Sequence, residues 1–398
     1  MRMRETLLGL LGGLLLSATL SIELAYATNC GTGTGTCFAL TGNTNVGTSW
    51  SDTDGGANCN ATCASGPAAG DACILTSNSG ALTINASLSC SSFNACAITG
   101  TAAYASTLTH NTAVVLTVSS NDAGAPAGGI AFCLPASTYS TASGRVVTFT
   151  AAAGTVTITT NANSIGAVTL NGAAPDFTLG GALTVLGTLT FTDGVLITNN
   201  NAVSVSTFSS NNANTRTLTL GSSTVTITGT TGNVWDFGTT TNLTMTASTS
   251  TIDFNATATG RRQWLGGTIT VNNVSVTNPV GNAYAFAFSM GGGTFTCANL
   301  TLTNLRNLRI DTGTHRVTGT LTYNGTSSAP GYVESSGLTN GTIQLDGANT
   351  TSWVFPQNIN RTGAGSWTAN NSYDMGGNGG TIAINAPAGG ASVHCIGC

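Results

Sequence analysis

Lysine is absent from this sequence, and all ten cationic side chains are arginines. Charged residues make up 6% of the chain, against roughly a quarter in ordinary globular proteins. Because cations are few and the formal net charge is −4, the chain cannot neutralise a phosphate backbone, so nucleic-acid binding is disfavoured. The 41% of hydrophobic residues disfavours disorder, which needs low hydrophobicity and high net charge. The surface must therefore consist of Thr, Ser, Asn and Gly.

The N-terminus has the pattern of a secretory signal peptide. Arg2 and Arg4 precede an apolar stretch from Leu7 to Ile22, and Ala25-Tyr26-Ala27 fits a small-x-small cleavage site. A retained anchor is the alternative, but the apolar stretch is short for a bilayer span. We therefore expect an exported chain, extracellular or at the cell surface, with the periplasm as an alternative and no membrane span after signal cleavage.

Eleven cysteines in an exported chain are expected to be mostly oxidised. Eight of them lie between Cys30 and Cys133, which predicts a stapled N-terminal region. Short-range pairs such as Cys30 with Cys37 and Cys90 with Cys96 fit the spacing, although the spacing does not define the connectivity. Because eleven is odd, at least one thiol is free or bonds to another chain. The candidate disulfide cysteines are Cys30, Cys37, Cys59, Cys63, Cys73, Cys90, Cys96, Cys395 and Cys398.

Apolar and small polar residues alternate through most of the chain. From Leu183 to Ile197 the odd positions are mostly apolar and the even positions are mostly Thr. A period of two predicts strands, and the intervening Gly, Asn and Asp clusters predict turns. No helix is expected after the signal peptide.

A second period of 20 to 30 residues lies over the alternation. Apolar-x-apolar pairs begin at Leu218, Leu243, Ile269, Phe295, Leu321 and Ile343, and a second series begins at Val225, Ile252, Val274 and Leu300. Such a repeat, carrying two or three short strands, is typical of a solenoid whose coils bury their inner faces by stacking. A β-sandwich also alternates but has no reason to keep a step near 26 residues. We predict an all-β solenoid and keep the sandwich as the alternative.

Several motifs resemble those of secreted bacterial parallel β-helix proteins. Gly47–Asp52 (GTSWSD) followed by Gly66–Ile74 (GPAAGDACI) resembles the first coil of such proteins. Arg216–Ile227 (RTLTLGSSTVTI) resembles their repeats, and Gly363–Gly380 (GAGSWTANNSYDMGGNGG) is similar to their last coil. The resemblance implies a right-handed parallel β-helix with a Cys-rich N-terminal cap. Its better known architectural relatives are adhesins, haemagglutinin-like exoproteins and polysaccharide lyases, so it does not choose a function.

Catalytic clusters are not visible in the sequence. Polysaccharide cleavage needs grouped carboxylates, often with a Lys or Arg, but the acids here are scattered singly and most sit beside Gly or Asn. We therefore predict no catalytic residue and no enzyme. The densest ionic stretch contains Arg306 and Arg309, which could line one loop and bind an acidic sugar, with a solvated turn as the alternative. Exposed Trp235, Trp264 and Trp353 would stack on sugars, with burial in loops or core as the alternative.

Two segments near the C-terminus have incomplete metal-site patterns. Gly376–Ile382 approaches a calcium-binding β-roll repeat, but Thr381 stands where that repeat has aspartate. His394 precedes a C-x-x-C formed by Cys395 and Cys398, which favours a disulfide over a metal site. No cofactor or metal ligand is therefore predicted.

The chain is predicted to comprise a signal peptide (1–27), a Cys-rich cap with the first coils (28–135), a β-solenoid (136–385) and a tail (386–398). The uncharged, repetitive surface favours an extracellular structural or adhesive protein that can assemble with itself into a fibre or surface layer. A carbohydrate-binding or polysaccharide-cleaving β-helix is the alternative. The expected partners are other copies of this chain or surface glycans.

Overall fold

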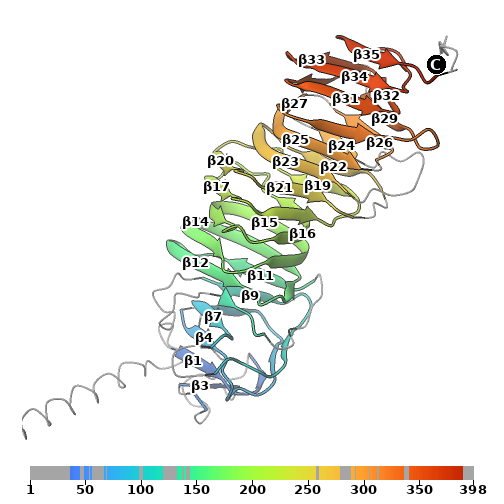
Figure 1. Ribbon diagram of the computed structural model, residues 1–398. Coiled ribbons are helices and arrows are strands. Elements are labelled where there is room, and N and C mark those ends of the chain that lie inside the picture. Colours follow the sequence, from blue (N-terminus) through green and yellow to red (C-terminus); the bar gives the residue numbers. More distant parts are fainter. Residues whose placement is uncertain are drawn as a thin grey trace, which may run out of the picture. The chain divides into compact units, whose positions relative to one another are not determined.

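The computed structural model describes residues 36–44, 49–52, 54–55, 67–68, 70–97, 102–119, 132–136, 139, 144–256, 260–277, 288–291, 293–303, 305–311, 313–335 and 340–388. The predicted signal peptide and the cysteines Cys30, Cys59, Cys63, Cys395 and Cys398 lie outside the described residues. Every regular element in the described ranges is a strand, which confirms the all-β prediction (Figure 1). No helix in these ranges is long and apolar enough to cross a membrane. The chain divides into two compact units, residues 1–140 and 141–398.

Unit 1 (residues 1–140) is built from ten short strands that stack mainly in parallel. They are β1 (Thr36–Ala39), β2 (Gly42–Asn43), β3 (Trp50–Ser51), β4 (Ala72–Ile74), β5 (Leu82–Ile84), β6 (Leu88–Cys90), β7 (Ser92–Asn94), β8 (Leu108–His110), β9 (Val115–Val118) and β10 (Phe132–Cys133). Three parallel stacks run β1–β4–β7–β10, β2–β5–β8 and β6–β9. β3 is the exception, because it pairs with β1 in the antiparallel sense. Its Trp50 is fully buried and donates its indole N–H to the Thr44 carbonyl at 2.9 Å.

Unit 2 (residues 141–398) consists of three parallel ladders that the chain visits in turn. The first ladder contains β11 (Val146–Phe149), β14 (Ala167–Leu179), β15 (Leu183–Ile197), β16 (Val203–Ser209), β19 (Gly232–Asp236), β22 (Arg262–Leu265), β24 (Phe288–Gly291), β26 (Asn307–Ile310), β29 (Gly331–Ser335) and β32 (Val354–Gln357).

The second ladder comes in two parts. The first part contains β12 (Gly154–Thr159), the ends of β14 and β15, β17 (Arg216–Thr219) and β20 (Leu243–Thr246). The second part contains the starts of β23 (Ile269–Val276) and β25 (Phe295–Thr303), then β27 (Thr314–Val317), β30 (Gly341–Leu345) and β33 (Ile359–Thr362).

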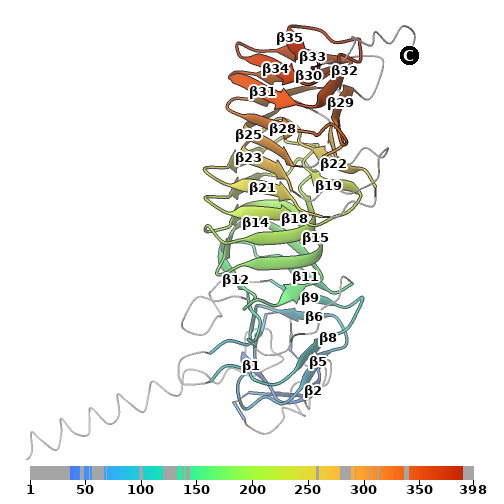
Figure 2. The same cartoon turned by 45° about the vertical axis from the view of Figure 1, so that its right-hand side comes forward.

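The third ladder contains β13 (Ser164–Ile165), the starts of β15 and β16, β18 (Thr224–Ile227), β21 (Thr251–Phe254), the ends of β23 and β25, β28 (Leu321–Asn324), β31 (Ala348–Ser352), β34 (Ser366–Asn370) and β35 (Ile382–Asn385). Figure 2 shows β21, β23, β25, β31 and β34 stacked along one side of unit 2. A chain that returns to the same three ladders in parallel register is a β-solenoid, as predicted.

Register shows which of the two sequence repeats was read correctly. Val225, Ile252, Val274 and Leu300 are successive partners in the third ladder, as their spacing predicts. In the other series only Ile269 and Phe295 are partners. Leu243 pairs with Arg216, and Leu321 pairs with Leu300 in the third ladder. The two ladders have similar apolar-x-apolar patterns, so spacing alone assigned Leu321 to the wrong one.

Alternate side chains along each strand form the core of unit 2. In β18, for example, Val225 and Ile227 are fully buried, while Thr224 is exposed and Thr226 is half-buried. Aromatic side chains continue this packing from coil to coil. The rings of Trp235 and Trp264 stack with centroids 4.9 Å apart, and Trp264 also contacts Phe295 at 5.1 Å. Such contacts bury large apolar areas, which is the main stabilising term available to a chain with few ionic groups.

Asparagine side chains join neighbouring coils at the corners. Asn200 has a positive φ of 60°, and its side-chain oxygen accepts the Ser222 N–H of the next coil at 2.8 Å. A Cβ added at Gly221, whose φ is +57°, would lie 2.2 Å from that oxygen, so only glycine fits there. Asn201 donates to the Leu179 carbonyl at 2.9 Å across another coil boundary. The Asn- and Gly-rich turns are therefore part of the stacking.

Two disulfides lie in unit 1, and they correct the pairing favoured by spacing. Cys90 bonds to Cys73, and Cys96 bonds to Cys133, so Cys90 and Cys96 are not partners. Cys37 is also disulfide-bonded, and it faces Cys73 between β1 and β4. The parallel register brings together cysteines from neighbouring coils, which are distant in sequence. Disulfides are compatible with an exported protein.

Peptide mapping of the non-reduced protein should recover Cys73–Cys90 and Cys96–Cys133. Chain-entropy arguments for loops of 17 and 37 residues give about 3 and about 4 kcal/mol of stabilisation, respectively. Replacing both Cys73 and Cys90 by Ser should therefore lower the free energy of unfolding measured in urea by about 3 kcal/mol. Recovery of a Cys90–Cys96 peptide would contradict the register of unit 1.

Candidate functional site

The tryptophans predicted to stack on sugars do not form an exposed platform. Trp235 is 0% exposed and Trp264 is 1% exposed, and both rings belong to the core of unit 2. The hypothesis of a sugar contact at these two residues is therefore wrong. Their alternation with small residues places them on the inward side of β19 and β22. Trp353 is half-buried at the corner between β31 and β32, with a φ of 55°.

Arg306 and Arg309 do not line one loop. Arg306 precedes β26 and borders a cavity of about 130 Å³ together with Leu305, Asn324 and Thr326. Arg309 lies on β26, and its guanidinium Nε donates to Asp311 at 2.8 Å. The predicted pair of cations for an acidic sugar is therefore divided between a corner and an occupied ion pair.

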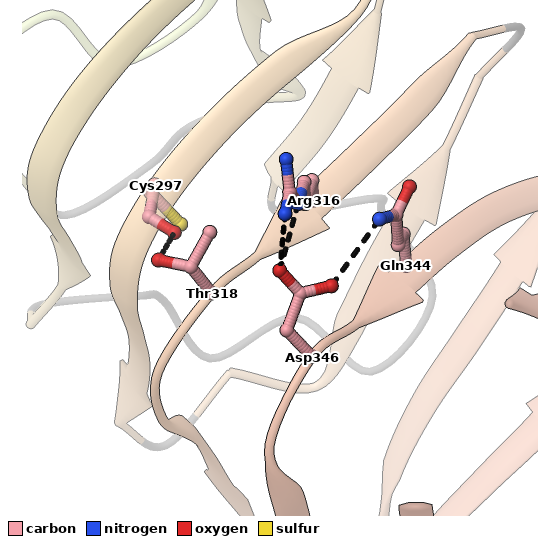
Figure 3. A network of polar contacts seen from close by, with 5 residues as sticks. All are labelled: Cys297, Arg316, Thr318, Gln344 and Asp346. Atoms are coloured by element: carbon pink, nitrogen blue, oxygen red, sulfur yellow. Dashed lines mark hydrogen bonds and ion pairs between the residues drawn. The ribbon is translucent and has the colours of Figure 1, made fainter. Parts of the chain in front are cut away.

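Arg316 and Asp346 form an ion pair on the outer side of the second ladder (Figure 3). The guanidinium Nη2 and Nε lie 2.6 and 2.8 Å from the same carboxylate oxygen, and Gln344 donates to the other oxygen at 3.2 Å. Arg316 first and Gln344 second lower the pKa of Asp346. Arg316 is 44% exposed, so water screens this pair and it contributes little to stability.

His315, next to Arg316, points into the core and is 0% exposed. It pairs in register with Phe295 and Ile343, and its ring contacts the Phe295 ring with centroids 5.7 Å apart. Neither ring nitrogen has a hydrogen-bond partner in the described part of the chain. Burial lowers the pKa of His315 to about 4, against a weaker opposing effect of Asp311. A side chain that stays neutral inside an apolar column is a core residue, not a ligand.

Two arginines lie unexpectedly in the core. Arg216 is 0% exposed and donates to the carbonyls of Ser210, Asn214, Thr239 and Thr241, so main-chain oxygens take the place of a carboxylate. Burial lowers the pKa of Arg216, although Asp193 opposes the effect.

Arg262 is buried as well, and it donates from Nη1 to the Phe254 carbonyl at 3.1 Å. Burial lowers the pKa of Arg262 to about 10. Both arginines occupy strand positions that read as inward by alternation, which is the signal that could have found them.

Groups that could hold a metal or carry out acid–base chemistry are dispersed. In the described ranges, no three His, Cys, Asp or Glu side chains gather closely enough to bind a metal ion. Cys297 is a free thiol in the core, and burial raises its pKa to about 12, so it is a poor nucleophile. Thr318 donates its hydroxyl to the carbonyl of Cys297 at 3.3 Å, a contact between coils (Figure 3).

The outer faces of the ladders carry rows of uncharged polar side chains. In the third ladder these side chains bond to one another: Ser275 donates to Asp253 at 2.6 Å, and Asn299 donates to Asn273 at 2.9 Å. In the second ladder Thr217 aligns with Thr244 and Thr270 aligns with Thr296. These rows are the most regular candidate surface in unit 2.

A cavity of about 310 Å³ lies where the second ladder changes from its first part to its second. Met245, Val271 and Cys297 form its apolar part, and Ser248, Thr270 and Thr318 are among its polar residues. Met245 belongs to β20, and no described strand pairs with β20 on the side facing β23. The apolar interior is therefore reached most closely by solvent at this point of the second ladder.

Replacing Trp264 by Ala should lower the free energy of unfolding by about 3–5 kcal/mol, because it empties a core position between two aromatic neighbours. The change Trp353→Ala at a half-buried corner should cost considerably less. Urea titration measures both values, and acrylamide quenching of tryptophan fluorescence should find most indoles shielded. Equal costs for the two variants would mean that Trp264 does not pack in the core.

Acid should destabilise the protein through His315. In the unfolded chain its pKa is near 6.5 and in the folded chain about 4, so the unfolded state binds one more proton between these values. The stabilisation is fully present above pH 6.5 and is lost as the pH falls towards 4, by about 1.4 kcal/mol per pH unit.

The change His315→Leu should remove this part of the pH dependence. The carboxylates and other groups titrate in both proteins, so their contribution cancels in the difference. Urea unfolding at several pH values between 7 and 4 measures that difference. Parallel curves for the two proteins would show that His315 titrates normally in the folded chain.

The arrangement of unit 2 therefore offers outer faces of hydroxyls and amides over an apolar core, with ionic side chains either paired, buried or isolated. Comparisons with protein-family models, with curated proteins and with solved structures find no match to this chain.

Proposed function

We propose that this chain is an exported structural or adhesive β-solenoid protein that acts outside the cell. The observation that carries the proposal is the coat of uncharged polar rows on the parallel ladders, in which Thr, Ser and Asn recur at aligned positions. Such rows present the same chemistry at every coil and suit repeated contacts with an extended partner. In this proposal the coil is right-handed, and the Cys-rich part of residues 28–135 is its N-terminal cap.

The disulfides Cys73–Cys90 and Cys96–Cys133 support the assignment to an oxidising compartment. The N-terminal pattern of Arg2, Arg4 and Ala25-Tyr26-Ala27 supports export. A non-enzymatic role is favoured because the described acids are paired singly or isolated. Arg309 with Asp311 and Arg316 with Asp346 are simple ion pairs, which are common structural contacts.

Self-assembly is supported by the last described strand. β35 pairs with β34 on one side, and no described strand pairs with it on the other. Ile382 and Ile384 stack in register on Trp367 and Ala369, yet both isoleucines remain partly exposed. A free strand edge above an apolar layer is a template for another chain. We propose that a second copy docks there, which gives a dimer or a fibre.

Light scattering and electron microscopy of the exported protein over a range of concentrations test this assembly. The native protein should form dimers or filaments as the concentration rises. Ile384→Lys, which puts a charge on the partly exposed apolar layer, should shift the population to monomers. Thr322→Lys, on the exposed outer side of β28, is the matched control and should leave assembly unchanged. Native protein that stays monomeric at every concentration would refute the assembly.

A further inference from the structure

A pair of aligned threonine columns lies on the outer side of the second ladder. In β17 and β20 the outward residues are Thr-x-Thr, and the starts of β23 and β25 are each preceded by threonine, which gives Thr-x-Thr again. The members of this threonine array are Thr217, Thr219, Thr244, Thr246, Thr268, Thr270, Thr294 and Thr296.

The strand register aligns these side chains in two dimensions. Thr217 and Thr219 pair with Thr244 and Thr246, and Thr270 pairs with Thr296. Neighbouring strands lie about 4.8 Å apart, and residues i and i+2 of one parallel strand lie about 6.6 Å apart. Hydroxyl and methyl groups therefore repeat on a near-rectangular grid within each part of the ladder. Oxygen atoms on a prism face of hexagonal ice repeat at similar distances in two perpendicular directions.

The hydroxyl groups of the array are available to solvent. None of the eight makes a side-chain hydrogen bond to another residue in the described ranges, whereas Ser275 and Asn299 of the third ladder bond to neighbouring side chains. Thr244, Thr246, Thr268, Thr270 and Thr294 are exposed, and the other three are half-buried by their neighbours. A β-branched side chain in a strand has restricted χ1, so the oxygens are held in place before any ligand arrives.

The array ends where its chemistry changes. On one side Val195 and Ile197 precede Thr217 and Thr219 in register, and on the other Arg316 follows Thr296. Arg316 is held by Asp346, so the ion pair closes the uncharged surface (Figure 3). Between the two halves of the array lies the cavity bordered by Met245 and Thr270. The eight threonines thus form an uncharged patch with defined limits.

We propose that the threonine array binds an ordered water lattice, namely the surface of ice. Methyl groups and fixed hydroxyls at lattice spacing can order a first water layer, and the absence of charge within the patch avoids strongly hydrated groups that would disrupt that layer. A crystalline polysaccharide would also present a periodic surface. Sugar rings, however, are bound mainly by aromatic stacking, and Trp235 and Trp264 are buried in the core. The inference is independent of the structural or adhesive role proposed above.

Thermal hysteresis of the disulfide-bonded exported protein tests this inference. The freezing point of a solution with a seed ice crystal should fall below its melting point, and recrystallisation of ice should be slowed. Thr246→Lys and Thr270→Lys, which place a strongly hydrated charge in the array, should each reduce the hysteresis several-fold. Thr246→Val, which keeps the shape and removes the hydroxyl, should reduce it less.

Thr322→Lys provides the control, because it makes the same change on the exposed outer side of the third ladder. It should retain the native hysteresis, and urea unfolding should show that all variants remain folded. Native protein without hysteresis or recrystallisation inhibition would overturn the inference. Adsorption to crystalline cellulose or chitin without any effect on ice would overturn it as well and would assign the array to a polysaccharide. Equal losses in Thr246→Lys and Thr322→Lys would show that the array is not the binding surface.

Discussion

Parallel pairing of each strand with the equivalent strand one coil later is the constraint on which unit 2 depends. It places identical positions above one another, so a buried residue in one coil must be buried in the next. Val225, Ile252, Val274 and Leu300 follow this rule in the third ladder, and Trp235 and Trp264 follow it in the first. The same rule acts on the outer side, where it converts alternating threonines into rows. The core and the surface are therefore both consequences of one hydrogen-bond register.

Neutral amides and main-chain carbonyls do the work that ionic pairs do in many other proteins. Asn200 and Asn201 connect neighbouring coils through their side chains, and the positive φ of Asn200 lets it turn the corner as well. Arg216 shows the limit of this strategy. Its guanidinium is held by carbonyl oxygens from two coils, which satisfies its donors without a carboxylate in contact. A buried charge is tolerated when its hydrogen bonds are made, even at a desolvation cost.

The class of fold and the length of the coil could be predicted from alternation, because period two and the step near 26 residues both follow from stacking. The assignment of strands to ladders could not, since Leu218 and Leu321 look alike in sequence yet lie in different ladders. The disulfides were misread for a related reason: spacing favours near neighbours such as Cys90 and Cys96, whereas parallel register joins cysteines one coil apart. Trp235 and Trp264 were taken as exposed, although alternation along their strands places them inside.

A surface made by register has properties that no single residue carries. One threonine on a loop is a weakly polar group, but Thr217, Thr219, Thr244 and Thr246 are held together by a ladder whose spacing is set by the backbone. Any ligand that repeats at this spacing gains one further contact per coil without further ordering of the protein, so affinity grows with the number of aligned coils. Charge would spoil this gain, because each ion would retain its own water. The scarcity of ionic side chains is therefore a requirement of such a surface, and the ion pair of Arg316 with Asp346 lies at its border.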